Sequence, residues 1–253
     1  MKIALMREED KSGDSLMFCT RQGLTPVIAP AIETYSLPVD VTVLSSDIAQ
    51  ADVCIFMSPT AVDRLFGLES FDPSIMKRGK MKIVAVGGAT SARLSEHGIM
   101  SEVPDTFSSE GLVRHLAASA TDHRRVFVLR SDSGSEKLKI GLGAYGMDVR
   151  EHALYGIRLP LNTFALEELI RGILGGEQVI LPFSSSMMVR NFFAVAGKLA
   201  VPELITEGMS RCIIWAIGDE TAAELSRHGI EDFLKAGRAD FRLMLQEIVD
   251  GIE

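Results

Sequence analysis

The chain has 253 residues, 47% of them hydrophobic and 24% charged, which is enough to bury one large hydrophobic core or two smaller ones. Its 26 basic and 34 acidic side chains give a formal net charge of −8, which argues against nucleic acid or an acidic membrane surface as a partner. No apolar run is long enough to span a bilayer, no signal peptide precedes the first predicted strand, and the three cysteines show no paired spacing, so we expect a reduced, cytoplasmic protein.

Strands and helices alternate along the first half of the chain. The predicted elements are, in order, a strand at 2–6, a helix at 15–22, an extended segment with two prolines at 25–35, a helix at 45–50, a strand at 52–57, a helix at 61–66, a strand-turn-helix unit at 83–99 and a helix at 108–120. Short apolar runs such as 2–6 and 52–57 are typical of strands that a parallel sheet buries on both faces.

The same order returns in the second half. The corresponding elements are a strand at 126–130, an extended segment at 148–159, a helix at 163–172, a strand at 179–183, a helix that opens at three serines at 184–186, a strand-turn-helix unit at 214–230 and a final helix at 241–252. Two copies of this alternation predict an α/β protein with two doubly wound, flavodoxin-like parallel-sheet domains that arose by internal duplication.

The clearest repeat is the strand-turn-helix unit. Residues 83–99 read IVAVGGATSARLSEHGI, and residues 214–230 read IWAIGDETAAELSRHGI. Thr90 and Thr221 stand where a hydroxyl can cap the first helical turn, whose backbone N–H groups also form a ready site for an anion. On the residues alone, capping is the better explanation of these threonines, and both roles use the same helix end.

Ligands of doubly wound sheets bind beyond the carboxyl ends of the strands, so the strand-to-helix turns are the candidate site. Besides the two glycine turns, these are the serine turns at 58–61 and 184–186, and alignment of the two halves places Ser185 opposite Ser58. The sequence has no phosphate-binding loop, dinucleotide fingerprint or nucleophile elbow. It also has no metal-ligand spacing, so we expect no metal site. For Tyr155, the residues alone favour an aromatic side chain that packs an extended segment.

Taken together, these motifs resemble the uroporphyrinogen-III synthase family across essentially the whole chain. The segments that carry the resemblance are Phe56-Met-Ser58-Pro59-Thr60-Ala-Val62, Val86-Gly87-Gly-Ala-Thr90, Gly146 to Tyr155, Phe183-Ser184-Ser185-Ser186 with Val189-Arg190-Asn191-Phe192, and Ile217-Gly218-Asp-Glu-Thr221. None of these motifs is specific by itself, and their order and duplication carry the resemblance.

The resemblance implies two α/β domains joined by a two-stranded linker, with the substrate bound between the domains. Carried over to this chain, one domain comprises 1–34 plus 160–253, the other comprises 38–153, and the linker strands lie near 30–37 and 153–159. The repeat by itself does not distinguish this exchange of the first β-α unit from two sequential halves.

The resemblance also implies a reaction. The linear tetrapyrrole hydroxymethylbilane closes to uroporphyrinogen III with inversion of the last pyrrole ring, loss of water and no cofactor, and Tyr155 is the expected general acid for the leaving hydroxyl. The residues expected to bind the eight carboxylates of the substrate are Ser58, Pro59, Thr60, Gly87, Thr90, Ser184, Ser185, Gly218 and Thr221. We expect a monomer, with the upstream bilane synthase as a partner that hands over the substrate.

Some residues depart from the family pattern. Met57 replaces a threonine, and Gly88 and Ser186 replace prolines. Asp219 and Glu220 place two carboxylates at a helix start that would receive an anion, which is unfavourable for an octa-acid substrate. Two alternatives therefore stay open: a non-catalytic two-domain sensor that binds a tetrapyrrole or another anion, and an α/β enzyme that acts on another anionic metabolite, such as a sugar phosphate.

Overall fold

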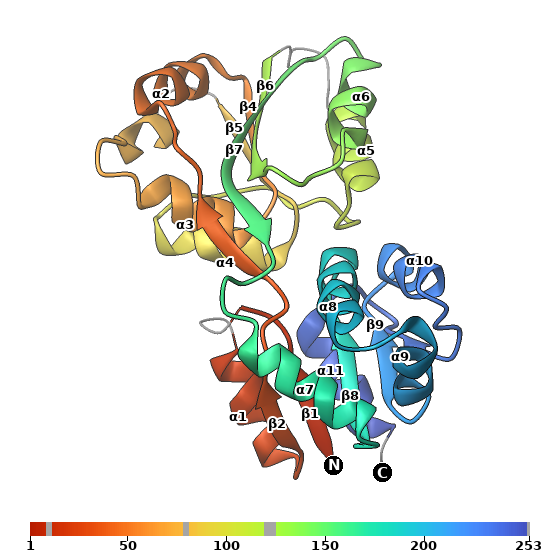
Figure 1. The fold of residues 1–253 in the computed structure, drawn as a ribbon. Coiled ribbons are helices and arrows are strands. Elements are labelled where there is room, and N and C mark those ends of the chain that lie inside the picture. Colours follow the sequence, from red (N-terminus) through yellow and green to blue (C-terminus); the bar gives the residue numbers. More distant parts are fainter. Residues whose placement is uncertain (9–11, 78–80, 119–124, 252–253) are drawn as a thin grey trace. The chain divides into compact units, whose positions relative to one another are not determined.

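The apolar runs of the sequence form the parallel strands of two β-sheets, one in each of two compact units (Figure 1). The computed structural model describes residues 1–8, 12–77, 81–118 and 125–251. The chain divides into two compact units: unit 1 comprises Met1–Thr34 and Arg158–Glu253, and unit 2 comprises Tyr35–Ile157.

In the described part of unit 1, five strands form a sheet in the order β10-β9-β8-β1-β2, with parallel pairing throughout. The elements of this unit are β1 (Lys2–Leu5), α1 (Gly13–Arg21), β2 (Thr25–Ile28), α7 (Phe164–Leu174), β8 (Val179–Phe183), α8 (Ser186–Leu199), α9 (Pro202–Met209), β9 (Ile213–Ala216), α10 (Asp219–Arg227), β10 (Leu234–Lys235) and α11 (Phe241–Asp250). Numbered within the unit, the strand order is 2-1-3-4-5, which is the flavodoxin-like order. The pairing of β1 with β8 joins the first strand of the chain to its second half.

In the described part of unit 2, five strands lie in the order β3-β7-β6-β4-β5. The elements are β3 (Glu33–Ser36), α2 (Val41–Gln50), β4 (Val53–Phe56), α3 (Pro59–Phe66), the 3-10 helix η2 (Pro73–Lys77), β5 (Lys82–Ala85), α4 (Gly88–Glu96), α5 (Ser109–Ala118), β6 (Arg125–Ser131), α6 (Lys137–Gly143) and β7 (Asp148–Arg158). The segment β6-α6-β7 occupies the place that β1-α1-β2 has in unit 1, and β4-α3-β5-α4 corresponds to β8-α8-β9-α10. The predicted fold class, α/β with parallel sheets in two duplicated parts, is confirmed.

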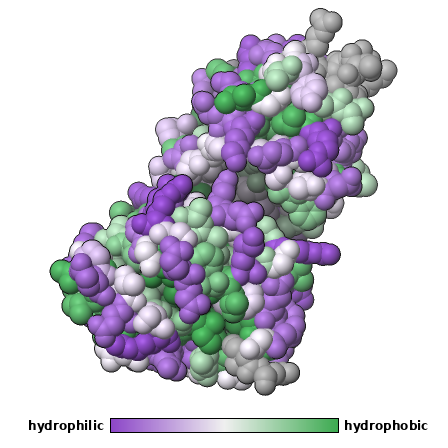
Figure 2. All heavy atoms as spheres, turned by 90° about the vertical axis from the view of Figure 1, so that its right-hand side faces the viewer, coloured by the Kyte–Doolittle hydropathy of each residue, from purple (hydrophilic) through white to green (hydrophobic). Residues whose placement is uncertain are grey.

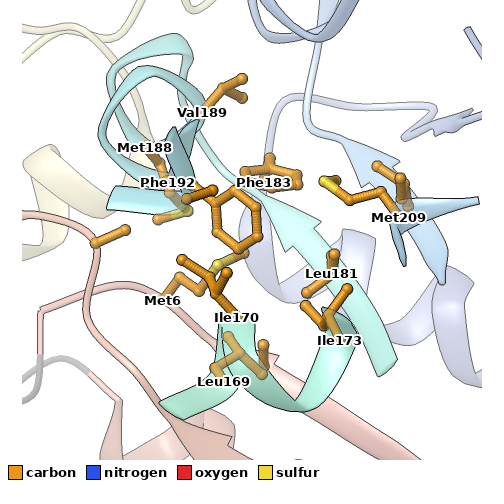
Figure 3. Packing of buried hydrophobic residues seen from close by; sticks show 14 of the residues in the cluster. Met6, Leu169, Ile170, Ile173, Leu181, Phe183, Met188, Val189, Phe192 and Met209 are labelled. Atoms are coloured by element: carbon orange, nitrogen blue, oxygen red, sulfur yellow. The ribbon is translucent and has the colours of Figure 1, made fainter. Parts of the chain in front are cut away.

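Burial on both faces of the sheets explains the continuous apolar runs. In β1, Ala4 packs into the hydrophobic cluster beneath α7 and α8, whereas Leu5 packs into the cluster beneath α1 and α11. Figure 3 shows the first of these clusters, where the rings of Phe183 and Phe192 meet edge to face with their centroids 5.5 Å apart. A strand covered by helices on both sides needs apolar residues at every position, so its sequence does not alternate.

The duplicated histidines at the ends of α4 and α10 have a packing role that the sequence did not reveal. The His97 ring stacks on Phe66, with ring centroids 4.1 Å apart, and the His228 ring stacks on Phe193 at 4.2 Å. His97 thus joins α4 to α3, and His228 joins α10 to α8, so the two contacts are equivalent in the duplication.

Four elements of the structure have no counterpart among the predicted ones, namely η2, α6, α9 and β10. The helix α6 contains Gly141 and Gly143, which have low helix propensity. A Cβ atom at Gly141 would lie 2.6 Å from Val113 Cγ2 of α5, so the close packing of the two helices requires the glycine. Tertiary packing therefore stabilises a helix that local propensity does not favour.

Candidate functional site

The two serine turns are equivalent N-caps at the carboxyl ends of β4 and β8. Ser58 precedes α3, and its Oγ accepts a hydrogen bond from the backbone N–H of Ala61 at 3.0 Å. Ser185 precedes α8, and its Oγ accepts from the N–H of Met188 at 3.2 Å. Both serines have the same extended backbone, with φ at −167°. The equivalence predicted from the repeat is confirmed, and Pro59 stands at the first position of α3, where its missing N–H carries no penalty.

Tyr155 lies directly beside the first serine turn. The side chain is only 6% exposed, and its phenol oxygen is 2.8 Å from Ser58 Oγ. The register of β6 against β7 shifts at this point, because Arg130 pairs with Ala153 whereas Ser131 pairs with Tyr155. Such a bulge redirects side chains at the end of a strand. The tyrosine is therefore an ordered, largely desolvated hydroxyl at the carboxyl edge of the sheet of unit 2.

The contact between Tyr155 and Ser58 suits a proton donor. The Ser58 oxygen is held in place by the N–H of Ala61, and the phenol can donate to it or accept from it. The oxygen also lies at the N-terminus of α3, where the helix dipole favours negative charge. A phenol at this position can lose its proton while its conjugate base stays close to a positive potential.

Three residues around Tyr155 were not anticipated from the sequence. The Tyr35 hydroxyl lies 3.3 Å from Asp132 Oδ2, and the backbone N–H of Asp132 donates to the carbonyl oxygen of Tyr155 at 3.0 Å. A Cβ atom at Gly156 would collide with the ring of Tyr35, so this ring packs on the backbone next to Tyr155. Asp132 could have been found, because it directly follows a strand at the edge where ligands bind; Tyr35 and Gly156 carry no such signal.

The glycine turns differ from the prediction in one respect. The N-caps of α4 and α10 are Gly87 and Gly218, and neither helix has a side-chain cap. Thr90 and Thr221 occupy the third helical position and are 2% and 3% exposed, so the prediction that their hydroxyls cap these helices is wrong. Because the caps lack a side chain, the first N–H groups of each helix have no side-chain acceptor at the cap.

Asp219 does not stand alone at the start of α10. Its carboxylate accepts a hydrogen bond from Lys235 Nζ at 2.7 Å, and Lys235 lowers the pKa of Asp219. Lys235 belongs to β10, which pairs with β9, so the cation comes from the neighbouring strand. The unfavourable charge that the sequence places at this helix start is therefore partly offset within unit 1.

The helix pairs of the two units carry ion pairs of opposite polarity. In unit 2, Arg93 of α4 pairs with Asp63 of α3 and with Glu96, at 3.0 and 2.7 Å. At the corresponding positions of unit 1, Glu224 of α10 pairs with Arg190 of α8 and with Arg227, at 3.5 and 2.7 Å. Figure 2 faces the side of unit 1 that carries α9 and α10, where hydrophilic side chains surround exposed hydrophobic ones. The duplication kept the positions of these contacts and inverted each charge.

The structure groups the predicted site residues into two sets, one at the carboxyl edge of each sheet. The set in unit 2 is Ser58, Pro59, Thr60, Gly87, Thr90 and Tyr155, on the paired strands β4 and β5 and on β7. The set in unit 1 is Ser184, Ser185, Gly218 and Thr221, after the paired strands β8 and β9. Of the two sets, the one in unit 2 includes a tyrosine, whose phenol can serve as a proton donor and lies 2.8 Å from Ser58 Oγ.

Across residues 1–8, 12–77, 81–118 and 125–251, no three histidine, cysteine or acidic side chains converge in a way that could hold a metal ion. The same residues include no helix that is long and apolar enough to cross a membrane. Burial raises the pKa of the Cys19 thiol to about 11, which disfavours a reactive thiolate there.

Comparison with known proteins gives a consistent result. The family model described as Uroporphyrinogen-III synthase HemD matches residues 18–246. A protein of Methanothermobacter thermautotrophicus named "Putative uroporphyrinogen-III synthase" is 32% identical over 232 residues, which cover 90% of each chain.

Solved structures share the fold. A mutant uroporphyrinogen III synthase from the extremely thermophilic bacterium Thermus thermophilus superposes with a TM-score of 0.63 at 18% identity, and the match covers 100% of both chains. The uroporphyrinogen-III synthetase of Helicobacter pylori 26695 gives a TM-score of 0.64 at 17% identity, over 91% of this chain and 93% of that one.

Proposed function

The chain belongs to the uroporphyrinogen-III synthase family, and from this premise we propose that Tyr155 is the residue that protonates the leaving hydroxyl in the family's reaction. The protein is a cofactor-independent cyclising lyase of tetrapyrrole biosynthesis. It closes hydroxymethylbilane to uroporphyrinogen III, with inversion of the last pyrrole ring and loss of water.

The observation that carries the role of Tyr155 is its contact with Ser58. Breaking the carbon–oxygen bond of the substrate requires a proton on the departing hydroxyl, which then leaves as water. The phenol of Tyr155 supplies this proton, and the Ser58 hydroxyl at the start of α3 stabilises the phenolate that remains. The proton lost from the closing ring restores the phenol, so the cycle needs no cofactor.

The carboxylates of the substrate bind to helix starts in both units. In unit 2, α3 and α4 begin at Pro59-Thr60 and after Gly87, with Thr90 in the first turn of α4. In unit 1, α8 begins after Ser184-Ser185, and α10 begins after Gly218, with Thr221 in its first turn. Backbone N–H groups bind carboxylates without cationic side chains, which reconciles an octa-acid substrate with a net charge of −8. We assign the stronger anion site to α4, because α10 carries Asp219 and Glu220 in its first turn.

The protein works as a monomer in the cytoplasm and receives its substrate from the upstream bilane synthase. This part of the proposal rests on the biosynthetic role of the family. Analytical ultracentrifugation at increasing protein concentration tests the monomeric state. An average mass that rises above that of one chain would contradict it.

The test of the function is the isomer that forms. Hydroxymethylbilane incubated with the protein should yield the type III ring, whereas the spontaneous reaction yields the type I ring. Tight binding of the bilane with only the type I product would instead indicate a non-catalytic binding protein.

A further inference from the structure

A pocket of about 580 Å³ lies in unit 1 between α1 and α11. Phe18 of α1 and the buried Phe241 and Leu245 of α11 provide its apolar wall. The volume falls within the range of small-molecule sites, which is roughly 300–1,000 Å³. None of its lining residues belongs to the serine and glycine turns, so this pocket is separate from the residues assigned to the reaction.

Three arginines converge on this pocket. Arg7 enters from the end of β1, Arg21 from the last turn of α1 and Arg242 from the first turn of α11. Among the lining residues that the structure describes, these three arginines are accompanied by one carboxylate, that of Asp14. Among the residues that the structure describes, neither Arg21 nor Arg242 forms an ion pair. Their charge is therefore available to a ligand.

Arg7 is held differently from the other two arginines. Its guanidinium carbon lies 4.7 Å from the centre of the Phe241 ring, which is a cation–π contact. Burial lowers the pKa of Arg7, and the nearby carboxylates of Glu8 and Asp240 oppose that shift. An anion beside a partly desolvated guanidinium interacts more strongly than it would in water.

The duplication provides an internal comparison for this pocket. The helix pair at the corresponding place in unit 2 is α6 with α5, and these helices pack directly, with Gly141 against Val113. In unit 1 the pair α1 and α11 leaves an open volume, with arginines and aromatic rings around it. Direct helix packing is thus compatible with the fold, and the opening is a property of unit 1.

We propose that the α1–α11 pocket binds a small aromatic anion that carries two negative charges as carboxylates or as a phosphate ester. The apolar wall accepts the ring, and Arg21 and Arg242 pair with the acidic groups. This inference does not depend on the role proposed for Tyr155.

Calorimetric titration of the intact chain with 1-naphthyl phosphate tests the proposal. We expect one site per chain, with tighter binding than for 1-naphthol, which lacks the anion, or for inorganic phosphate, which lacks the ring. The variant Arg21→Gln/Arg242→Gln should weaken binding by about tenfold per arginine, because a charge-assisted hydrogen bond is worth about that factor. Titration with naphthalene-1,4-dicarboxylate distinguishes a carboxylate ligand from a phosphate ligand.

The matched control is Arg171→Gln/Arg211→Gln, which removes two exposed arginines of unit 1 that lie outside the pocket lining. This control should bind 1-naphthyl phosphate as the unmodified chain does. Ser15→Trp keeps all three arginines but fills the pocket, and should abolish binding. Unchanged affinity in Arg21→Gln/Arg242→Gln, or an equal loss in the control, would overturn the proposal.

Discussion

The phenol oxygen of Tyr155 and Oγ of Ser58 lie 2.8 Å apart, although 97 residues separate them in the chain. The same serine oxygen caps α3, so one atom connects the expected proton donor to the positive end of a helix. Ser185 repeats the cap at the start of α8. The duplication therefore supplies a natural control for experiments on Ser58.

Tyr155→Phe should lower kcat by about 10²-fold or more with a small change in KM, because general acid catalysis contributes about 10²–10⁴-fold. The ring stays in place, and only the proton donor is lost. Steady-state kinetics of type III ring formation measure this effect. Tyr145→Phe, at a side chain that is 62% exposed, is the control and should leave both constants unchanged. An unaltered kcat in Tyr155→Phe would remove the tyrosine from the mechanism.

Ser58→Ala and Ser185→Ala should destabilise the protein by similar amounts, about 1 kcal/mol each, because each removes one N-cap. Only Ser58→Ala also removes the hydroxyl 2.8 Å from the phenol of Tyr155, so kcat should fall in this variant, whereas Ser185→Ala, at a helix start assigned to substrate binding, should act mainly on KM. Denaturant unfolding and turnover are measured on the same preparations. Equal turnover in the two variants would show that the contact between Ser58 and Tyr155 has no catalytic role.

Gly156→Ala should destabilise unit 2 by about 1–3 kcal/mol, because the added methyl group meets the ring of Tyr35. Tyr35→Ala in the same chain should recover most of the loss by freeing that space. Gly197→Ala is the control, since nothing lies within 4 Å of its Cβ position. Failure of Tyr35→Ala to rescue Gly156→Ala would place the strain elsewhere.

The inverted ion pairs should differ in their contribution to stability. Arg93 is 42% exposed, so Arg93→Gln should cost less than about 1 kcal/mol. Glu224 is 8% exposed and pairs with two arginines, so Glu224→Gln should cost more, about 1.5–3 kcal/mol. Thermal unfolding of the two variants measures this difference. A larger loss of stability in Arg93→Gln than in Glu224→Gln would mean that burial does not determine how much these ion pairs contribute.

Glu102 should make the stability of unit 2 depend on pH in the acid range. Burial would raise the pKa of Glu102, but hydrogen bonds from His115 and Lys82 outweigh it, and the pKa lies below the usual value of 4.5. Because the pKa of Glu102 is lower in the folded state than in the unfolded state, the ionised carboxylate stabilises the fold at pH values above the unfolded pKa. This contribution is lost as the pH falls through the folded pKa. Glu102→Gln should therefore show a smaller loss of stability between about pH 5 and about pH 3. If the free energy of unfolding falls equally with pH in Glu102→Gln and in the unmodified chain, Glu102 is not the source of the acid dependence.

Much of the local structure could be predicted from the sequence because it depends on nearby residues. Ser58 and Ser185 act as N-caps through hydrogen bonds to N–H groups three residues ahead. The threonines of the glycine turns were misassigned, because a glycine cap has no side chain and the nearest hydroxyl in the sequence stands inside the helix. The helix α6 was missed, since Gly141 is explained only by the proximity of Val113.

The sequence by itself determined the alternation of strands and helices, the duplication and the positions of the serine turns, because apolar periodicity and capping act over a few residues. Only the tertiary structure decided that β1 lies between β2 and β8, that Tyr155 contacts Ser58, and that Arg7 and Arg21 share a pocket with Arg242. These contacts join segments far apart in the chain, and they form only when strand pairing and burial of both sheet faces offset the entropy of closing long loops.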